Sequence, residues 1–221
     1  MNKLFKYILI LLSYFCYNVL FRMVAYSFNI NYYSMDTKGK IIFTIITSFI
    51  YLLFIIFIYR KELLNELKAF KHDAKNHLLN NILIYLAGIL LMGISNIILT
   101  KITNYNLAGN EMQVREYINK YPLYMIYSSI IFAPLIEELI FRKTIKKIFK
   151  YKYLFIIISG LIFGILHISN FKDINEILFS IPYIIMGIDF AYIYYKTDNI
   201  FTTISFHLLH NLVLLIIQLI F

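Results

Sequence analysis

The fold is decided by stretches such as IIFTIITSFIYLLFIIFIY, residues Ile41–Tyr59, which contain no charged side chain. At a rise of 1.5 Å per residue, about 20 apolar residues in a helix cross the roughly 30 Å hydrocarbon core of a bilayer. Inside that core each backbone amide needs a partner within the protein, and a helix supplies it. This stretch is therefore predicted to be a membrane-spanning helix.

Six further stretches are also mainly apolar and long: Leu4–Ser27, Leu78–Thr100, Tyr121–Phe141, Tyr153–Ile168, Ile177–Tyr195 and Ile200–Phe221. The 221-residue chain is 61% hydrophobic with a mean hydropathy of +0.72, well above the values of a soluble domain. We expect an all-α, polytopic transmembrane bundle of seven helices, or eight if a re-entrant piece forms near Leu63–Phe70. No Pro/Gly/Ser-rich linker divides the chain, so residues 1–221 are interpreted as a single integral membrane domain.

Lysine and arginine are unevenly distributed between these spans. With a cytoplasmic N-terminus, fourteen of them fall inside and six outside, or seven with Arg22. Cytoplasmic connections carry the excess of Lys and Arg, so we expect a cytoplasmic N-terminus and an external C-terminus at Phe221. The longest polar connections are Arg60–His77, expected inside, and Lys101–Lys120, expected outside.

Composition also limits the class of protein. The net charge of +9 fits cytoplasmic anchoring of membrane helices, and we expect no nucleic-acid partner. The Leu4–Ser27 stretch is too long for the apolar region of a signal peptide and lacks a small-x-small cleavage site, so it is interpreted as a membrane helix. Cys16 is the only cysteine, which excludes an internal disulfide. The Ile-, Lys-, Asn- and Tyr-rich composition indicates an AT-rich, bacterial genome, so we expect the multi-pass protein to lie in a bacterial plasma membrane.

The fourth span ends with a group of ionisable residues, Glu137-Glu138-x-x-x-Arg142. Charged side chains in a membrane persist mainly when they are paired or functional. Glu138 and Arg142 are four residues apart on one helix face and can pair, whereas Glu137 points about 100° away and is free for another partner. Pro134 removes the backbone bond to the carbonyl of Ile130 and is expected to kink the helix before the glutamates.

Two later spans carry histidines and an amide. In the fifth span Phe163 and His167 share a stripe, and Gly160 and Gly164 form a small-x-x-x-small pair that favours close packing of a neighbouring helix. In the seventh span His207 and Asn211 are four residues apart on one face. We counted 1.5 Å per residue along ideal helices from the cytoplasmic boundary of the hydrocarbon core. This places Glu137, His167, His207 and Asn211 at depths of about 11 to 21 Å. A single cavity can therefore contain all four side chains.

Asp189 and His210 are two further polar residues of the membrane helices. The spacing of Asp189 links it to none of the others, and His210 lies partly to one side of the His207 face. We assign no role to either.

The three motifs, in this order, resemble those of the CPBP family, also called the CAAX protease or Abi family of intramembrane endopeptidases. The resemblance covers roughly Tyr121 to Phe221, the expected catalytic core. It implies hydrolysis of peptide bonds by a glutamate-activated water. It further implies Glu137 as the general base, His167 as the residue that positions the water, His207 and Asn211 as oxyanion stabilisers, and Glu138 with Arg142 as the supporting ion pair.

The expected substrate is a small peptide or a membrane-associated protein, and processing of a bacteriocin-like or signalling peptide is as plausible as cleavage of a prenylated CAAX protein. No cofactor is expected. Zinc is the alternative, because two Glu and two or three His could supply its ligands, although the chain lacks H-E-x-x-H. A non-proteolytic membrane partner, such as an immunity or regulatory protein, is the other alternative. A transporter fits less well, because the chain is short and shows no inverted repeat.

Overall fold

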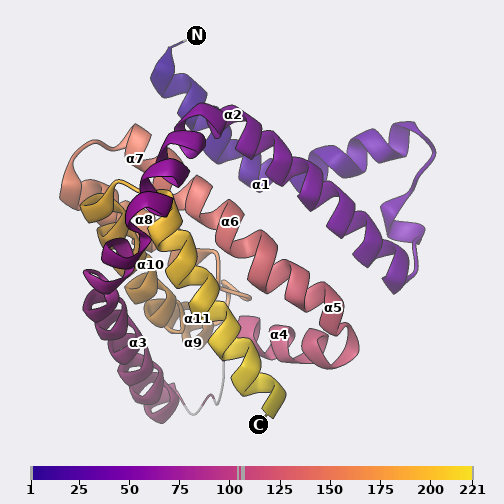
Figure 1. Cartoon of the computed structure of the whole chain (residues 1–221). Coiled ribbons are helices and arrows are strands. Elements are labelled where there is room, and N and C mark those ends of the chain that lie inside the picture. The colour runs from indigo at the N-terminus through magenta and orange to yellow at the C-terminus, as the bar shows by residue number, and fades with distance from the viewer. Residues whose placement is uncertain (1, 104, 106–107, 221) are drawn as a thin grey trace.

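A computed structural model describes residues 2–103, 105 and 108–220, and its helices form one bundle with no strand among the described residues (Figure 1). Phe221, the predicted end of the last span, lies outside these residues. Six described helices are long and apolar enough to cross a membrane, which confirms the polytopic helical bundle. They are α1 (Lys3–Ser27), α2 (Thr37–Leu79), α3 (Ile82–Thr103), a composite fourth membrane helix (Pro122–Ile148), α9 (Ile174–Leu178) continued by α10 (Ser180–Thr197), and α11 (Ile200–Ile220).

The fifth predicted span, Tyr153–Ile168, corresponds to α8 (Lys152–Ile165), which has only 14 residues. At 1.5 Å per residue it is about 21 Å long, too short to cross the hydrocarbon core alone. The span was expected to continue to Ile168, but the helix ends earlier in a tight turn in which the His167 amide donates to the Gly164 carbonyl at 3.1 Å. His167 therefore lies in the turn that follows the helix.

The Arg60–His77 stretch is helical, and its prediction as a polar connection was wrong. It continues α2, whose N-terminus is capped by the Asp36 carboxylate, and the backbone leaves helical geometry only at Asp73. Tertiary contacts stabilise this extension, because Leu63 packs against the main core and Phe70 lies against Phe201. The second polar connection, 101–120, likewise contains a helix, α4 (Gly109–Lys120), with two exposed i,i+4 ion pairs.

Helices α8 and α10 form the most extensive helix pair of the bundle. A Cβ atom on Gly187 of α10 would lie 2.9 Å from the Cα of Gly160, and one on Gly164 would lie 3.0 Å from the Ser180 carbonyl oxygen. The absence of side chains therefore allows the two backbones to approach closely. The close packing predicted for Gly160 and Gly164 is confirmed.

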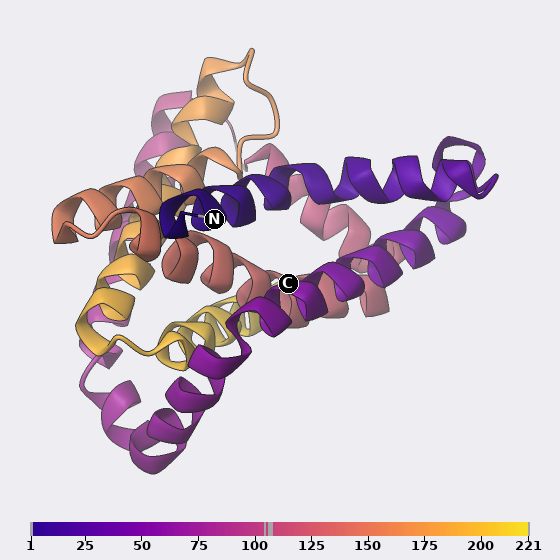
Figure 2. The same cartoon turned by 90° about the horizontal axis from the view of Figure 1, so that it is seen from above.

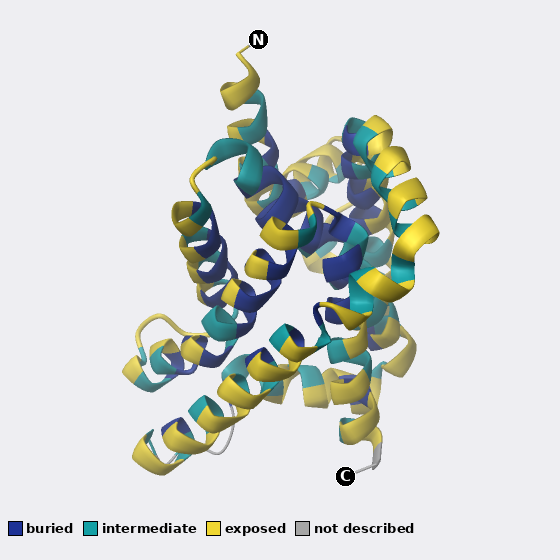
Figure 3. Cartoon of the chain, turned by 60° about the vertical axis from the view of Figure 1, so that its left-hand side comes forward, coloured by how far each residue is buried: buried dark blue, intermediate teal, exposed yellow. Residues whose placement is uncertain are grey.

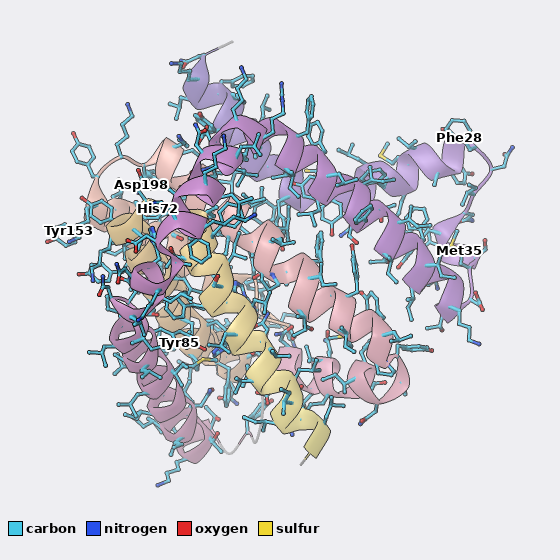
Figure 4. The ribbon with its side chains drawn as sticks, in the orientation of Figure 1. Phe28, Met35, His72, Tyr85, Tyr153 and Asp198 are labelled. Atoms are coloured by element: carbon cyan, nitrogen blue, oxygen red, sulfur yellow. The ribbon has the colours of Figure 1, made fainter. Side chains whose placement is uncertain are left out.

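Buried residues gather where the helices meet, and the outer faces are exposed and apolar, as expected for contact with lipid (Figure 3). Helices α1 and α2 form a hairpin that projects from the rest of the bundle (Figure 2), with Phe28 and Met35 near its tip (Figure 4). Near the bundle, the α1–α2 hairpin packs on the fourth membrane helix through Tyr17, Tyr51 and Ile136. This core fixes the helix that carries the glutamates.

Candidate active site

The fourth membrane helix departs from α-helical geometry on both sides of Glu137. A π-helical segment η2 (Ile126–Phe132) precedes the short α6 (Ala133–Glu137), and a second, η3 (Glu138–Thr144), leads into α7 (Ile145–Ile148). Such π-helical segments are rare and often occur at functional sites. Here the two π-helical segments change which backbone carbonyls have no hydrogen bond within the helix.

Pro134 and Asn211 illustrate this change. The Ala133 amide donates to the Ser128 carbonyl, five residues back. Under this spacing the missing N–H of Pro134 leaves the carbonyl of Ser129 without a partner, whereas α-helical spacing had pointed to Ile130. The Asn211 side-chain amide donates to that Ser129 carbonyl at 2.8 Å. The proline thus creates an acceptor that holds Asn211 in place.

Glu138 is fully enclosed and joins two other site residues. Its Oε1 lies 3.3 Å from Nη1 of Arg142 and 2.8 Å from Nδ1 of His207. The ion pair predicted for Glu138 and Arg142 is present. With a carboxylate as acceptor, Nδ1 of His207 carries the proton, and its Nε2 faces Glu137. The bond between Glu138 and His207 links α11 to the fourth membrane helix.

Arg142, the residue directly after the predicted fourth span, lies inside the protein. Its side chain is fully buried, with the guanidinium 4.4 Å from the ring centre of Phe163 and 5.5 Å from that of Phe190. Its Nη2 donates to the Gly187 carbonyl over 3.4 Å. Among the described residues, Nε and Nη1 have no hydrogen-bond acceptor. The buried positive charge is therefore stabilised mainly by the Glu138 carboxylate and by the faces of the two aromatic rings.

Glu137 differs from its neighbour because it borders open space. Its side chain is 16% exposed and lines a cavity of about 400 Å³, together with His167, His207 and Asn211. Its nearest ionic partner is Nε2 of His207, at 3.9 Å, which is beyond hydrogen-bonding distance and leaves room for a bridging water. The structure therefore brings together in one cavity wall the four side chains that were predicted to lie at middle depth in the membrane.

His167 is held in one orientation. Its Nδ1 lies 2.8 Å from the Phe163 carbonyl oxygen, and its ring stacks on Tyr183 with 4.2 Å between ring centres. A carbonyl only accepts hydrogen bonds, so Nδ1 carries the proton and Nε2 of the neutral ring is an acceptor. The Phe163-x-x-x-His167 motif thereby defines the tautomer as well as the position of the histidine.

Sequence reasoning missed several residues of the cavity wall. Tyr183 supports His167, and Phe190 stacks on His207 with 5.1 Å between ring centres. His210 also lines the cavity. Asp189 instead lies buried against Gly88 of α3, and its Oδ2 has no hydrogen-bond partner among the described residues. No spacing rule links these aromatic residues to the motifs, because they come from other helices.

A metal site requires several ligands that converge on one point. Within the described part of the chain, no three His, Cys, Asp or Glu side chains have an arrangement that could hold a metal ion. The cavity presents carboxylate, imidazole and amide groups. The expectation that the site needs no metal stays a prediction.

Comparisons with known proteins agree with this geometry. Residues 119–213 match the family described as type II CAAX prenyl endopeptidase, Rce1-like, and this segment contains all six predicted site residues. The chain is 37% identical over 113 residues to the Bacillus subtilis (strain 168) protein named "Putative membrane peptidase YdiL". That match covers 50% of this chain and 43% of the relative, so the chain matches less than half of the relative's length. No solved structure matches the chain significantly.

Residues 119–213 are thus similar to Rce1-like CAAX prenyl endopeptidases, which confirms the resemblance to membrane peptidases of the CPBP family that the three motifs carry.

Proposed function

We propose that this protein is an intramembrane endopeptidase in which Glu137 activates a water molecule for attack on a peptide bond. One observation carries the proposal: of the two adjacent glutamates, Glu138 is enclosed and bonded, and Glu137 borders the cavity with no hydrogen-bonded partner among the described residues. The second carboxylate of the cavity wall, Glu111, lies on α4 and is paired with Arg115 at 2.8 Å. Glu137 is therefore the carboxylate available as a base.

The water is held between Glu137 and His167. The acceptor Nε2 of His167 takes one hydrogen bond from the water, and Glu137 removes the other proton as the oxygen attacks the peptide carbonyl carbon. The proton then passes from Glu137 to the leaving amine as the carbon–nitrogen bond breaks. This sequence returns the carboxylate to its starting form.

The negative charge on the carbonyl oxygen requires hydrogen-bond donors. Asn211 uses one amide hydrogen on the Ser129 carbonyl and keeps a second for the substrate. His207 donates Nδ1–H to Glu138, and in its imidazolium form it presents Nε2–H to the same space. Glu138 fixes the orientation of the His207 ring through this bond, and Arg142 balances the charge of Glu138. The pair is thus assigned to positioning His207.

The wall of the cavity suits a peptide. It combines apolar side chains, including Met125 and Leu215, with the amides of Asn96 and Asn110. Its volume of about 400 Å³ lies within the usual range of binding sites for small ligands. Small peptides and segments of membrane-associated proteins are the proposed substrates, including bacteriocin-like or signalling peptides.

Comparison of peptides released by cells tests this function. Cells producing the wild-type protein should process at least one peptide that accumulates unprocessed with Glu137→Ala, because this variant removes the base. Glu116→Ala is the matched control, since this exposed glutamate lies on α4 outside the cavity wall and pairs with Lys120. Identical peptide profiles for wild type and Glu137→Ala, at equal protein levels, would contradict the proposal and favour a non-proteolytic membrane partner.

A further inference from the structure

The cavity extends from Glu137 in one direction only. Along the fourth membrane helix its wall continues from Glu137 to Met125, and along α11 from His207 to Gln218. Each path is about 17 Å long at 1.5 Å per residue. Both lead to the same end of the bundle, where α4, α5 (Pro122–Met125) and the end of α11 lie (Figure 1). We define this end as the mouth of the cavity.

The opposite end of the cavity is closed. Directly beyond the glutamates, the side chains of Phe141, Arg142 and Lys143 are fully buried. Further along lies α7, on the opposite side of the bundle from α4 and the C-terminus (Figure 1). A substrate that reaches Glu137 along the axis of the cavity therefore enters from the mouth.

The closed end gathers the basic segments of the chain. Residues 60–80, 143–152 and 196–199 contact one another there through Lys147–Glu62 at 3.0 Å, Asn199–Glu66 at 2.8 Å and Lys196–Asn80 at 3.2 Å. These segments contribute ten cations besides the buried Lys143: Arg60, Lys61, Lys68, Lys71, Lys75, Lys146, Lys147, Lys150, Lys152 and Lys196.

The mouth end is much less basic. The segments around it are held together by the Tyr105 hydroxyl, which donates to Asp173 at 2.6 Å, and by the Gly109 amide, which donates to Glu176 at 2.9 Å. The bond from Tyr105 keeps the pKa of Asp173 below its usual value. The cations at this end are Lys38, Lys40, Lys101, Arg115, Lys120 and Lys172, of which Arg115 and Lys120 are paired with glutamates on α4.

From these observations we infer that the substrate reaches the site from the external face of the membrane. Excess Lys and Arg mark the cytoplasmic side, which is the closed end, so the mouth faces outward. Resting on the proposed function, this assigns the substrate to exported peptides or to the external segments of membrane proteins. Protein tails that emerge in the cytoplasm face the closed end and are not substrates by this route.

Cysteine labelling tests the inference without requiring activity. In a Cys16→Ser background, single cysteines replace Ser128 on the cavity wall, Lys120 at the mouth end and Lys150 at the closed end. Intact cells are treated with a membrane-impermeant maleimide before and after permeabilisation. Ser128→Cys and Lys120→Cys should label in intact cells, and Lys150→Cys only after permeabilisation.

Labelling of Lys150→Cys in intact cells, with Lys120→Cys protected, would overturn the orientation. Labelling of Lys120→Cys while Ser128→Cys stays protected even after permeabilisation would overturn access through the mouth.

An activity measurement separates this inference from the proposed function. Purified protein is assayed in detergent and then in right-side-out and inside-out vesicles, with a mixture of internally quenched fluorescent decapeptides added outside. The expected result is cleavage in detergent and in right-side-out vesicles only. Cleavage in detergent but only in inside-out vesicles would overturn the inference alone. No cleavage in detergent would remove the proposed function, and the substrate class with it.

Discussion

The buried pair of Glu138 and Arg142 allows a quantitative prediction. Both side chains are fully enclosed, with 3.3 Å between Oε1 and Nη1. Glu138→Gln keeps the shape of the side chain but leaves the guanidinium without its counter-charge. Because Nε and Nη1 of Arg142 find no hydrogen-bond acceptor among the described residues, no other group replaces the carboxylate.

Removing one partner of a buried ion pair typically destabilises a protein by about 3–5 kcal/mol. In a chain of this size, about 1 kcal/mol shifts the melting temperature by roughly 2–4 °C, so Glu138→Gln should lower it by about 6–20 °C. The rings of Phe163 and Phe190 beside the guanidinium favour the lower half of that range. Arg142→Gln should have a similar effect, because it leaves the buried carboxylate unpaired.

The assay is thermal unfolding in detergent of both single variants and of the double variant Glu138→Gln/Arg142→Gln. The double variant contains no unpaired charge from this pair. Its loss of unfolding free energy should therefore be smaller than the sum of the losses of the two single variants, by about 1–3 kcal/mol. Melting of Glu138→Gln within 2 °C of the wild type, or strictly additive losses, would refute the reasoning.

Three further predictions concern packing, a buried cation and metal. Gly187→Ala should reduce thermal stability and Gly93→Ala should not, because a Cβ at Gly187 meets backbone atoms of α8 and one at Gly93 meets nothing within 4 Å; unfolding temperatures of the two variants check this. Lys143→Ala should have a melting temperature more than 2 °C below that of Lys146→Ala in the same unfolding assay. Lys143 is buried against Glu62 and Glu66, whereas the partner of Lys146 is 82% exposed. Peptide hydrolysis by the purified protein should survive prolonged treatment with a strong chelator, and loss of activity that zinc restores would instead establish the zinc mechanism.

Local spacing in the sequence was sufficient to predict part of the site. The i,i+4 pairing of Glu138 with Arg142 depends only on the geometry of one helix, and it is present. The middle depth predicted for Glu137, His167 and His207 follows from counting residues along ideal helices, and all three line one cavity. Their catalytic roles stay predictions.

Longer-range features could not be predicted in this way. Lys143 follows directly after the end of the predicted fourth span and Arg142, but it is buried because α2 continues as a helix and brings Glu62 and Glu66 to it. Those partners are far away in the sequence, and no periodicity joins them. The same extension of α2 made the expected polar connection at 60–77 wrong.

The shift to π-helical geometry was also invisible to a pattern based on 3.6 residues per turn. It moves the carbonyl freed by Pro134 by one residue, from Ile130 to Ser129, and thereby determines what Asn211 contacts. The bond between His207 and Glu138 was missed for a different reason, because it depends on how two helices face each other. Single-sequence spacing contains no information on that rotation.

The turnover of Glu137→Gln in purified, detergent-solubilised protein tests the central claim most directly. The substitution keeps the size of the side chain and removes the base, so hydrolysis of quenched peptides should fall to background while the melting temperature stays within 2 °C of the wild type. Glu138→Gln, assayed alongside, should lose stability together with activity. Near wild-type turnover in Glu137→Gln, with a folded but inactive Glu138→Gln, would contradict the account and assign the base to Glu138.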